Sequence, residues 1–170
     1  MGNLEYRVEK IEHKLSEVDS SFEKLFNALE NKNELAAQGI FFEGQIFDAF
    51  HFVSKIIRSA RSSIILIDNY VNDDTLLLFS KANKGALITI YTQKTTDQLK
   101  QAIMKFNKQF GNLTIQNISI FHDRFLFIDQ KELYHIGSSL KDLGNKIFGF
   151  SKMNPQLYKL LAKLNESEKY

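Results

Sequence analysis

The sequence predicts an α/β fold in which a sheet is flanked by helices and preceded by a separate N-terminal helix. Three observations support this. An apolar heptad repeat fills the start of the chain, short apolar runs typical of buried strands follow it, and segments with helical spacing alternate with those runs. The 170 residues, 44% of them hydrophobic, suffice for one compact domain and an appendage. We expect a coiled-coil dimerisation helix over residues 1–36 and an α/β domain over residues 40–170, with a connector from Asn31 to Gly39.

The N-terminal segment has the pattern of a coiled coil. Its apolar residues recur with alternating gaps of four and three residues: Leu4, Val8, Ile11, Leu15, Val18, Phe22, Leu25 and Leu29. In a parallel pair Arg7 meets Glu12 and Lys14 meets Asp19, whereas an antiparallel pair brings like charges together. We therefore expect a parallel homodimer through the Leu4–Leu29 seam. Phe22 at a core position leaves open how many helices associate in the coiled coil. The alternative is an amphipathic helix lying on its own domain.

The elements of the second part are predicted from the period of their apolar residues. Helices are expected over Ile46–Ala60, over a short segment capped by Asp73 or Asp74 and ending at Phe79, from a cap at Thr95 or Thr96 to Phe110, and after Asn154 and Pro155. Strands are expected at Ser63–Asp68, Ala86–Tyr91, Leu113–Ile118, Phe125–Ile128, Glu132–Ile136 and Lys146–Ser151.

Composition limits the classes of function. The net charge is only +2, so any recognition of an anion must be local. The chain has no cysteine, which excludes disulfides and thiolate metal sites, and it shows no metal-ligand spacing, so no metal or cofactor is expected. No apolar run approaches the ~18 residues of a membrane span and no signal peptide is visible, so we expect no membrane partner and a cytoplasmic location.

The candidate site comes from two neighbouring segments. His122 and Arg124 are two residues apart in a predicted strand, which directs both side chains to one face. A neutral imidazole can attack phosphorus, and a cation beside it can neutralise the phosphate. The turn Gly137-Ser138-Ser139, one strand later, offers hydroxyls and N–H groups to the same anion. Each of these residues also has an alternative role. His122 can be a histidine at a strand end that only forms hydrogen bonds, and Arg124 can form an ordinary ion pair with Asp123 or Glu132. The residues Gly137-Ser138-Ser139 can simply be those that a turn prefers.

This pattern resembles the HKD-type signature of the phospholipase D superfamily. The signature is His-x-Lys, four residues, Asp, and then a Gly-Ser turn; here it reads His122-x-Arg124, four residues, Asp129 and then Gly137-Ser138. The order of elements from Gln45 to Ser151 is also similar to one domain of that family, which implies its mixed sheet. Arginine replaces the family's lysine, which keeps the charge but changes the geometry of a phosphate contact.

The resemblance implies a metal-free mechanism. One histidine attacks phosphorus and forms a phosphohistidine, and a second protonates the leaving oxygen, so two motif copies are needed. This chain has one copy and is therefore similar to the short, dimeric, endonuclease-type members. His122 is the candidate nucleophile in one subunit and the candidate general acid in the other, with the two domains side by side about a two-fold axis.

Three further residues are weaker candidates for binding or orienting phosphate. Asp129 is an odd number of residues from His122, which argues against direct catalysis, so the resemblance suggests an orienting role and turn formation is the alternative. Lys141 offers a second cation. Asn69, with Asp68, follows the first buried strand and is expected to reach the same rim.

Two functions remain open at this point. The first is a homodimeric, metal-independent nuclease, and nucleic acid is then the expected partner. The second is a catalytically silent module that binds nucleic acid or assembles, because Arg124 departs from the family and Leu140-Lys141-Asp142 follows the turn where the family often has Asn. A phospholipid-cleaving enzyme is less favoured, since no amphipathic membrane face is evident. The chain could also be the C-terminal part of a longer protein whose coil continues from a targeting domain.

Overall fold

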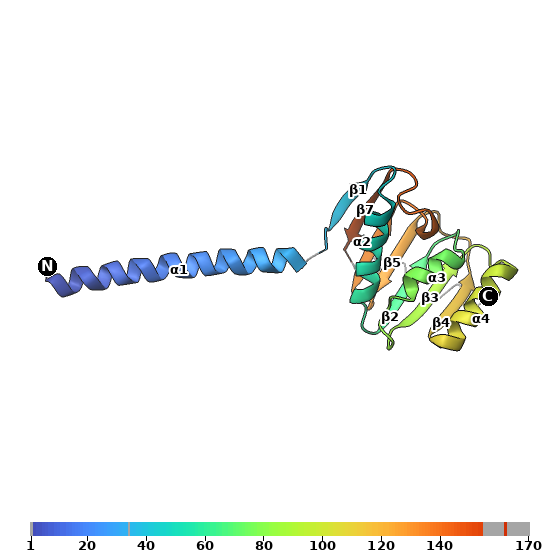
Figure 1. The fold of residues 1–170 in the computed structure, drawn as a ribbon, viewed down its shortest axis with the longest axis horizontal. Helices are drawn as coiled ribbons and strands as arrows, with labels where there is room; N and C mark the ends of the chain where they lie inside the picture. Colours follow the sequence, from blue (N-terminus) through green and yellow to red (C-terminus); the bar gives the residue numbers. More distant parts are fainter. Residues whose placement is uncertain (1, 34, 155–161, 163–170) are drawn as a thin grey trace. The chain divides into compact units, whose positions relative to one another are not determined.

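The computed structural model describes residues 2–33, 35–154 and 162. The chain divides into two compact units, Met1–Ala36 and Ala37–Tyr170. The first unit holds one helix, α1 (Asn3–Asn33), which covers the whole heptad segment (Figure 1). Those seam residues whose side chains are described are exposed, between 47% for Val8 and 73% for Leu4. The helix is confirmed, and its pairing stays a prediction.

The region between the two parts differs from the prediction. Helix α1 continues to Asn33, so the connector expected from Asn31 begins too early. Strand β1 (Gln38–Phe41) was not predicted and starts before the expected domain boundary at Ile40. Four residues are too few to establish an alternating pattern, and β1 is recognisable only by its antiparallel pairing with the last strand of the sheet, with Phe41 opposite Phe148.

The second unit is a mixed α/β domain, which confirms the predicted fold class. One seven-stranded sheet has the order β1-β7-β6-β5-β2-β3-β4, in which β2, β3 and β4 are parallel and the other pairs are antiparallel. Its further elements are α2 (Ile46–Ser59), β2 (Ser63–Ile67), α3 (Asp73–Phe79), β3 (Leu87–Thr92), α4 (Asp97–Gln109), β4 (Leu113–Asn117), β5 (Arg124–Ile128), β6 (Glu132–Ile136), η1 (Leu140–Asp142) and β7 (Phe148–Met153).

The predicted helix caps are partly correct. Thr96 caps α4 as expected, through its hydroxyl and the N–H of Leu99. Asn72, and not Asp73 or Asp74, caps α3, because its side chain accepts from the N–H of Thr75. The final helix predicted after Asn154 and Pro155 lies outside the described residues.

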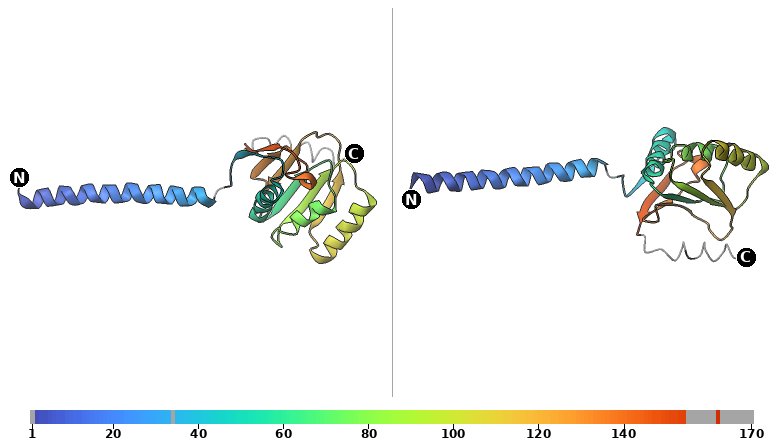
Figure 2. Two further views of the ribbon diagram at one scale, coloured as in Figure 1. Left: turned by 45° about the horizontal axis from the view of Figure 1, so that its top comes forward. Right: turned by 90° about the horizontal axis from the view of Figure 1, so that it is seen from below.

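Helices α2, α3 and α4 lie on one face of the sheet (Figure 2). The register shows which strand residues point to that face, since residues directly opposite each other share a side. Arg124 in β5 lies opposite Ile136 in β6, which lies opposite Phe150 in β7. The centroid of the Phe150 ring is 4.2 Å from the centroid of the Phe52 ring in α2. Arg124 therefore faces the helical layer. The opposite face carries a separate apolar cluster: Ile67, Tyr91, Ile118, Phe127 and Leu133.

The order of the strands places three chain segments at one end of the sheet. Strands β2 and β6 both run antiparallel to β5. The carboxyl ends of β2 and β6 therefore lie beside the amino end of β5, so Asp68, Arg124 and the Gly137-Ser138-Ser139 turn come together. Among the helices of the described segments, none is long and apolar enough to cross a membrane.

Asp129, at the opposite end of β5, fastens the loop between α2 and β2. Its carboxylate accepts the N–H groups of Arg61, Ser62 and Ser63 and the Ser62 hydroxyl, over 2.7–3.1 Å. Burial alone would raise the pKa of Asp129, but these hydrogen bonds outweigh it and hold the pKa far below the usual 3.8. Asp129 has a φ of 53°, a conformation that asparagine also tolerates.

We predict that Asp129→Asn lowers the free energy of unfolding at neutral pH by about 1–2 kcal/mol, because two of the charge-assisted hydrogen bonds that the carboxylate accepts become weaker or are lost. A depressed folded-state pKa stabilises above the unfolded value, so the contribution is complete above about pH 4 and disappears as the pH falls further. Urea unfolding between neutral and acid pH measures this. The variant should show a flatter acid limb than the parent, whereas the exposed Asp97→Asn control should follow the parent; parallel curves for all three would contradict the assignment.

Candidate functional site

A cavity of about 580 Å³ opens at the end of the sheet where β2, β5 and β6 meet. Its walls combine cations, hydroxyls, two aromatic rings and the turn after β6. The lining residues are Tyr70, Arg124, Gly137, Ser138, Ser139, Lys141, Asp142, Asn145, Lys146, Ile147 and Phe148. The structure thus brings together four sequence-predicted site residues, namely Arg124, Ser138, Ser139 and Lys141.

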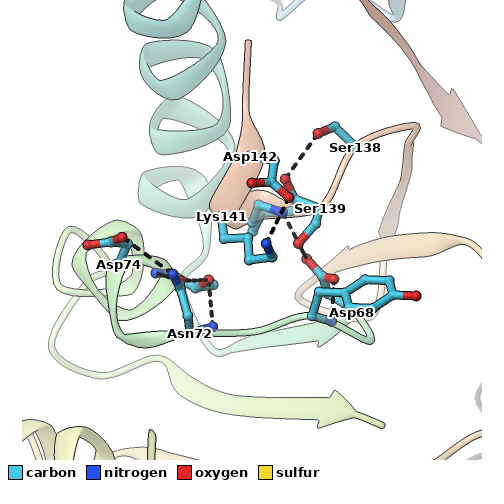
Figure 3. A network of polar contacts seen from close by, with 10 residues as sticks. Asp68, Asn72, Asp74, Ser138, Ser139, Lys141 and Asp142 are labelled. Carbon is cyan, nitrogen blue, oxygen red and sulfur yellow. Dashed lines mark hydrogen bonds and ion pairs between the residues drawn. The ribbon is translucent and has the colours of Figure 1, made fainter. Parts of the chain in front are cut away.

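Behind this cavity lies Asp68, whose side chain is completely buried. One carboxylate oxygen accepts the N–H of Tyr70 at 3.0 Å. The other accepts the Ser139 hydroxyl at 2.9 Å and the Leu140 N–H at 2.8 Å (Figure 3). Burial raises the pKa of Asp68 above its usual value, although these hydrogen bonds and the nearby charge of Arg124 oppose the shift. Asp68 therefore ties the end of β2 to the turn after β6.

The two serines of the turn have different environments. Ser139 is buried and its hydroxyl proton points to Asp68, so this hydroxyl is not free to donate to a phosphate. Ser138 is half-buried and donates only to the neighbouring carbonyl of Ser139, at 3.1 Å. A hydroxyl with so weak a local bond can turn toward a bound anion. The geometry therefore leaves the Ser138 hydroxyl able to contact a group in the cavity, whereas Ser139 supports the turn.

Arg124 is placed to act on an anion. Its guanidinium carbon lies 5.7 Å from the centroid of the Tyr70 ring, and its buried Nε has no hydrogen-bond partner among the described residues. The alternative of an ordinary ion pair is not found in the described chain, because Asp123 pairs with His135 at 3.5 Å and Glu132 with Lys152 at 3.0 Å.

His122 does not lie in a strand, contrary to the prediction. Strand β5 begins only at Arg124, and His122 belongs to the exposed segment that precedes it. It is not among the residues that line the cavity. The apolar run that identifies β5 starts at Phe125, so the sequence placed the strand correctly but gave no evidence that it extends back to His122.

The weaker candidates are distributed differently. Asn69 donates to the carbonyl of Phe121 at 2.7 Å and so holds the segment that carries His122. Lys141 lines the cavity and pairs with Asp142 at 3.1 Å. Asp129 follows the far end of β5 and fastens the α2–β2 loop, outside the cavity. The described residues hold no cluster of three or more histidine or acidic side chains able to bind a metal.

Several residues that line the cavity were not recognised as site residues in the sequence. Tyr70, Asn145 and Lys146 line the cavity, and none was a candidate. Tyr70 comes two residues after Asp68, beyond the carboxyl end of a buried strand, which is a position where ligand contacts are common in α/β sheets. Asn145 and Lys146 follow Gly144 in the loop before β7, and the strand predicted from Lys146 to Ser151 begins only at Phe148 and ends at Met153.

Comparison with solved structures agrees with the fold. NucT from Helicobacter pylori superposes with a TM-score of 0.54 at 18% identity, over 77% of this chain and 93% of that chain. This match confirms the predicted mixed sheet with flanking helices.

Two further matches have TM-scores of 0.49. TrmBL2, an archaeal chromatin protein with a novel mode of DNA binding, is 18% identical over 98% of this chain and 66% of its own. Polyphosphate kinase from Porphyromonas gingivalis is 13% identical over 85% of this chain and 26% of its own. The chain thus spans about two thirds of TrmBL2 and a quarter of the kinase. No family model matches the sequence. No curated protein matches it either.

We predict that the two serines differ in their effect on stability. Ser139→Ala removes a donor from a buried carboxylate and should lower the free energy of unfolding by about 1–3 kcal/mol. Ser138→Ala, next to it, should stay within about 0.5 kcal/mol of the parent, since its hydroxyl bonds only to a neighbouring carbonyl. Urea unfolding of both variants provides the comparison, and equal losses would contradict the role assigned to Asp68.

Proposed function

We propose that this chain is a homodimeric, metal-independent phosphodiesterase of the phospholipase D type, and that it acts on nucleic acid. The observation that carries the proposal is the cavity: Arg124 and Ser138, two parts of the HKD-type pattern, line it together with Lys141. They do so in a domain that has the fold of NucT. The Arg124 guanidinium and the Ser138 hydroxyl, which is able to rotate, can stabilise the negative charge that develops on a phosphoryl group in the transition state.

In the proposed mechanism, Nε2 or Nδ1 of one His122 attacks phosphorus, and the bond to the leaving oxygen breaks. The copy of His122 from a second chain donates a proton to that oxygen. Water then attacks the phosphohistidine, gives its proton to the second histidine, and releases a phosphomonoester and a neutral His122. Arg124 neutralises the phosphoryl oxygens throughout. His122 is exposed and lies outside the cavity of its own chain, which fits a site completed by a second chain.

Association would come from α1. Its described seam residues present apolar side chains along one helix face, and the charged flanks favour a parallel pair. Such a pair brings two identical domains to the same end of the coiled coil, as a mechanism with two histidines requires.

A silent module is the second candidate, and two observations favour it. Arg124 replaces the lysine of the signature, and the Ser139 hydroxyl is occupied by Asp68. Binding of an anion needs only the cavity, whereas turnover also needs His122 and its second copy.

We predict cleavage of plasmid DNA and of bis(p-nitrophenyl) phosphate in excess EDTA, because the chemistry needs no metal. His122→Ala should lower the rate by at least about 100-fold, as expected for loss of nucleophile and acid. His51→Ala, at an exposed histidine stacked on Phe47, is the matched control and should cleave like the parent. Cleavage that survives in His122→Ala would refute the mechanism, and absence of cleavage by the parent would favour the silent module.

Leu15→Glu places a charge in the seam and should convert the dimer into a monomer, because a buried unpaired carboxylate opposes association. Lys10→Glu changes a charge on the outer side of the same helix and should leave the dimer intact. Sedimentation equilibrium measures both masses. A monomeric parent, or a dimer in both variants, would show that the seam does not pair.

A further inference from the structure

The cavity carries a net positive charge close to a hydrophobic ring. Among the described residues, Arg124, Lys141 and Lys146 line it together with one acid, Asp142, which already pairs with Lys141. Asp68 behind it is completely buried and fully engaged by donors from Tyr70, Ser139 and Leu140. An entering group therefore meets cations and the Ser138 hydroxyl, which is the environment of a phosphate contact.

Tyr70 gives this cavity a second kind of contact. Its side chain is 53% exposed although it sits at the end of a buried strand, and it lines the cavity beside Arg124. The guanidinium of Arg124 lies over the ring at 5.7 Å from the centroid, so ring and cation form a layered pair at the cavity wall. An exposed aromatic ring next to a phosphate-binding cation is the arrangement on which unpaired bases stack in proteins that bind single strands.

The cavity also limits what can enter. Its volume of about 580 Å³ is in the range of pockets that hold one small ligand. In a duplex the base faces are covered by their neighbours, so a base must leave the stack before a side chain can cover it. A duplex could touch the rim with its phosphates but could not reach the face of Tyr70.

We propose that this cavity binds one unpaired nucleotide of single-stranded nucleic acid, with its phosphate at Arg124, Lys141 and Lys146 and its base against Tyr70. The inference rests on the proposed function for the position of the phosphate at Arg124 and names the substrate class of that same site. Tyr70 contributes affinity for the base, whereas the cations contribute affinity for the phosphate.

The test is fluorescence anisotropy with a short labelled DNA strand and its matched duplex, using the full chain with His122→Ala so that no strand is cleaved. The single-stranded DNA should bind more tightly than the duplex DNA at equal salt concentration. Tyr70→Ala should weaken strand binding at least about fivefold, the lower end for loss of one base stack. Tyr70→Phe, which keeps the ring, and Tyr6→Ala, at an exposed tyrosine of α1, should each match the parent.

An abasic strand of the same length separates the base from the phosphate. It should bind more weakly than the normal strand, and Tyr70→Ala should not weaken it further. If Tyr70→Ala weakens both strands equally, Tyr70 only supports Arg124 and the inference is overturned; equal binding of strand and duplex overturns it as well.

The cleavage assay in EDTA keeps the two proposals distinguishable. If the parent cleaves single-stranded and duplex DNA equally well, the nucleotide pocket is refuted and the phosphodiesterase proposal stands. If single-stranded DNA binds in a way that depends on Tyr70 but is not cleaved, the phosphodiesterase proposal is refuted and the nucleotide pocket stands.

Discussion

The site depends on one buried carboxylate. Asp68 is completely removed from solvent, and a charge in that position is strongly destabilising unless several donors satisfy it. Tyr70, Ser139 and Leu140 supply those donors, and the charge of Arg124 lies near enough to lower the pKa of Asp68. Satisfying this carboxylate holds the end of β2, the start of β5 and the turn after β6 in one arrangement, and the cavity is the space in front of it.

This arrangement divides the polar groups between support and recognition. The Ser139 hydroxyl and the Leu140 N–H are used internally, while Ser138, Arg124 and Lys141 remain on the cavity wall. The same division explains how a chain with a net charge of only +2 can bind an anion, since three cations, Arg124, Lys141 and Lys146, line one cavity. His122 stands apart from this wall on a segment held by Asn69, and a second chain is the proposed source of the missing half of the site.

The sequence predicted the regular elements well because periodicity is a local property. The buried runs at Ser63–Ile67 and Phe125–Ile128 and the Thr96 cap of α4 were recognisable without the fold. Strand β1 was not, because it is short and exists through pairing with β7. The roles of Ser139 and Tyr70 also depend on partners far along the chain, and a Gly-Ser-Ser turn gives no sign of which hydroxyl faces a buried acid. The spacing of His122 and Arg124 suits one face of a strand, but the hydrogen-bonded ladder of β5 begins at Arg124, so His122 lies outside it.

The most direct test of this account follows the Arg124 Nε–H signal by ¹⁵N NMR during a titration with dimethyl phosphate, the simplest phosphodiester anion. Nε is buried, has no partner among the described residues, and belongs to a side chain on the cavity wall. We expect a saturable shift of this signal and of the Ser138 amide, while the signal of the Leu140 amide, which already donates to Asp68, stays in place. An unmoved Arg124 signal, or small non-saturating shifts spread over the whole domain, would contradict it.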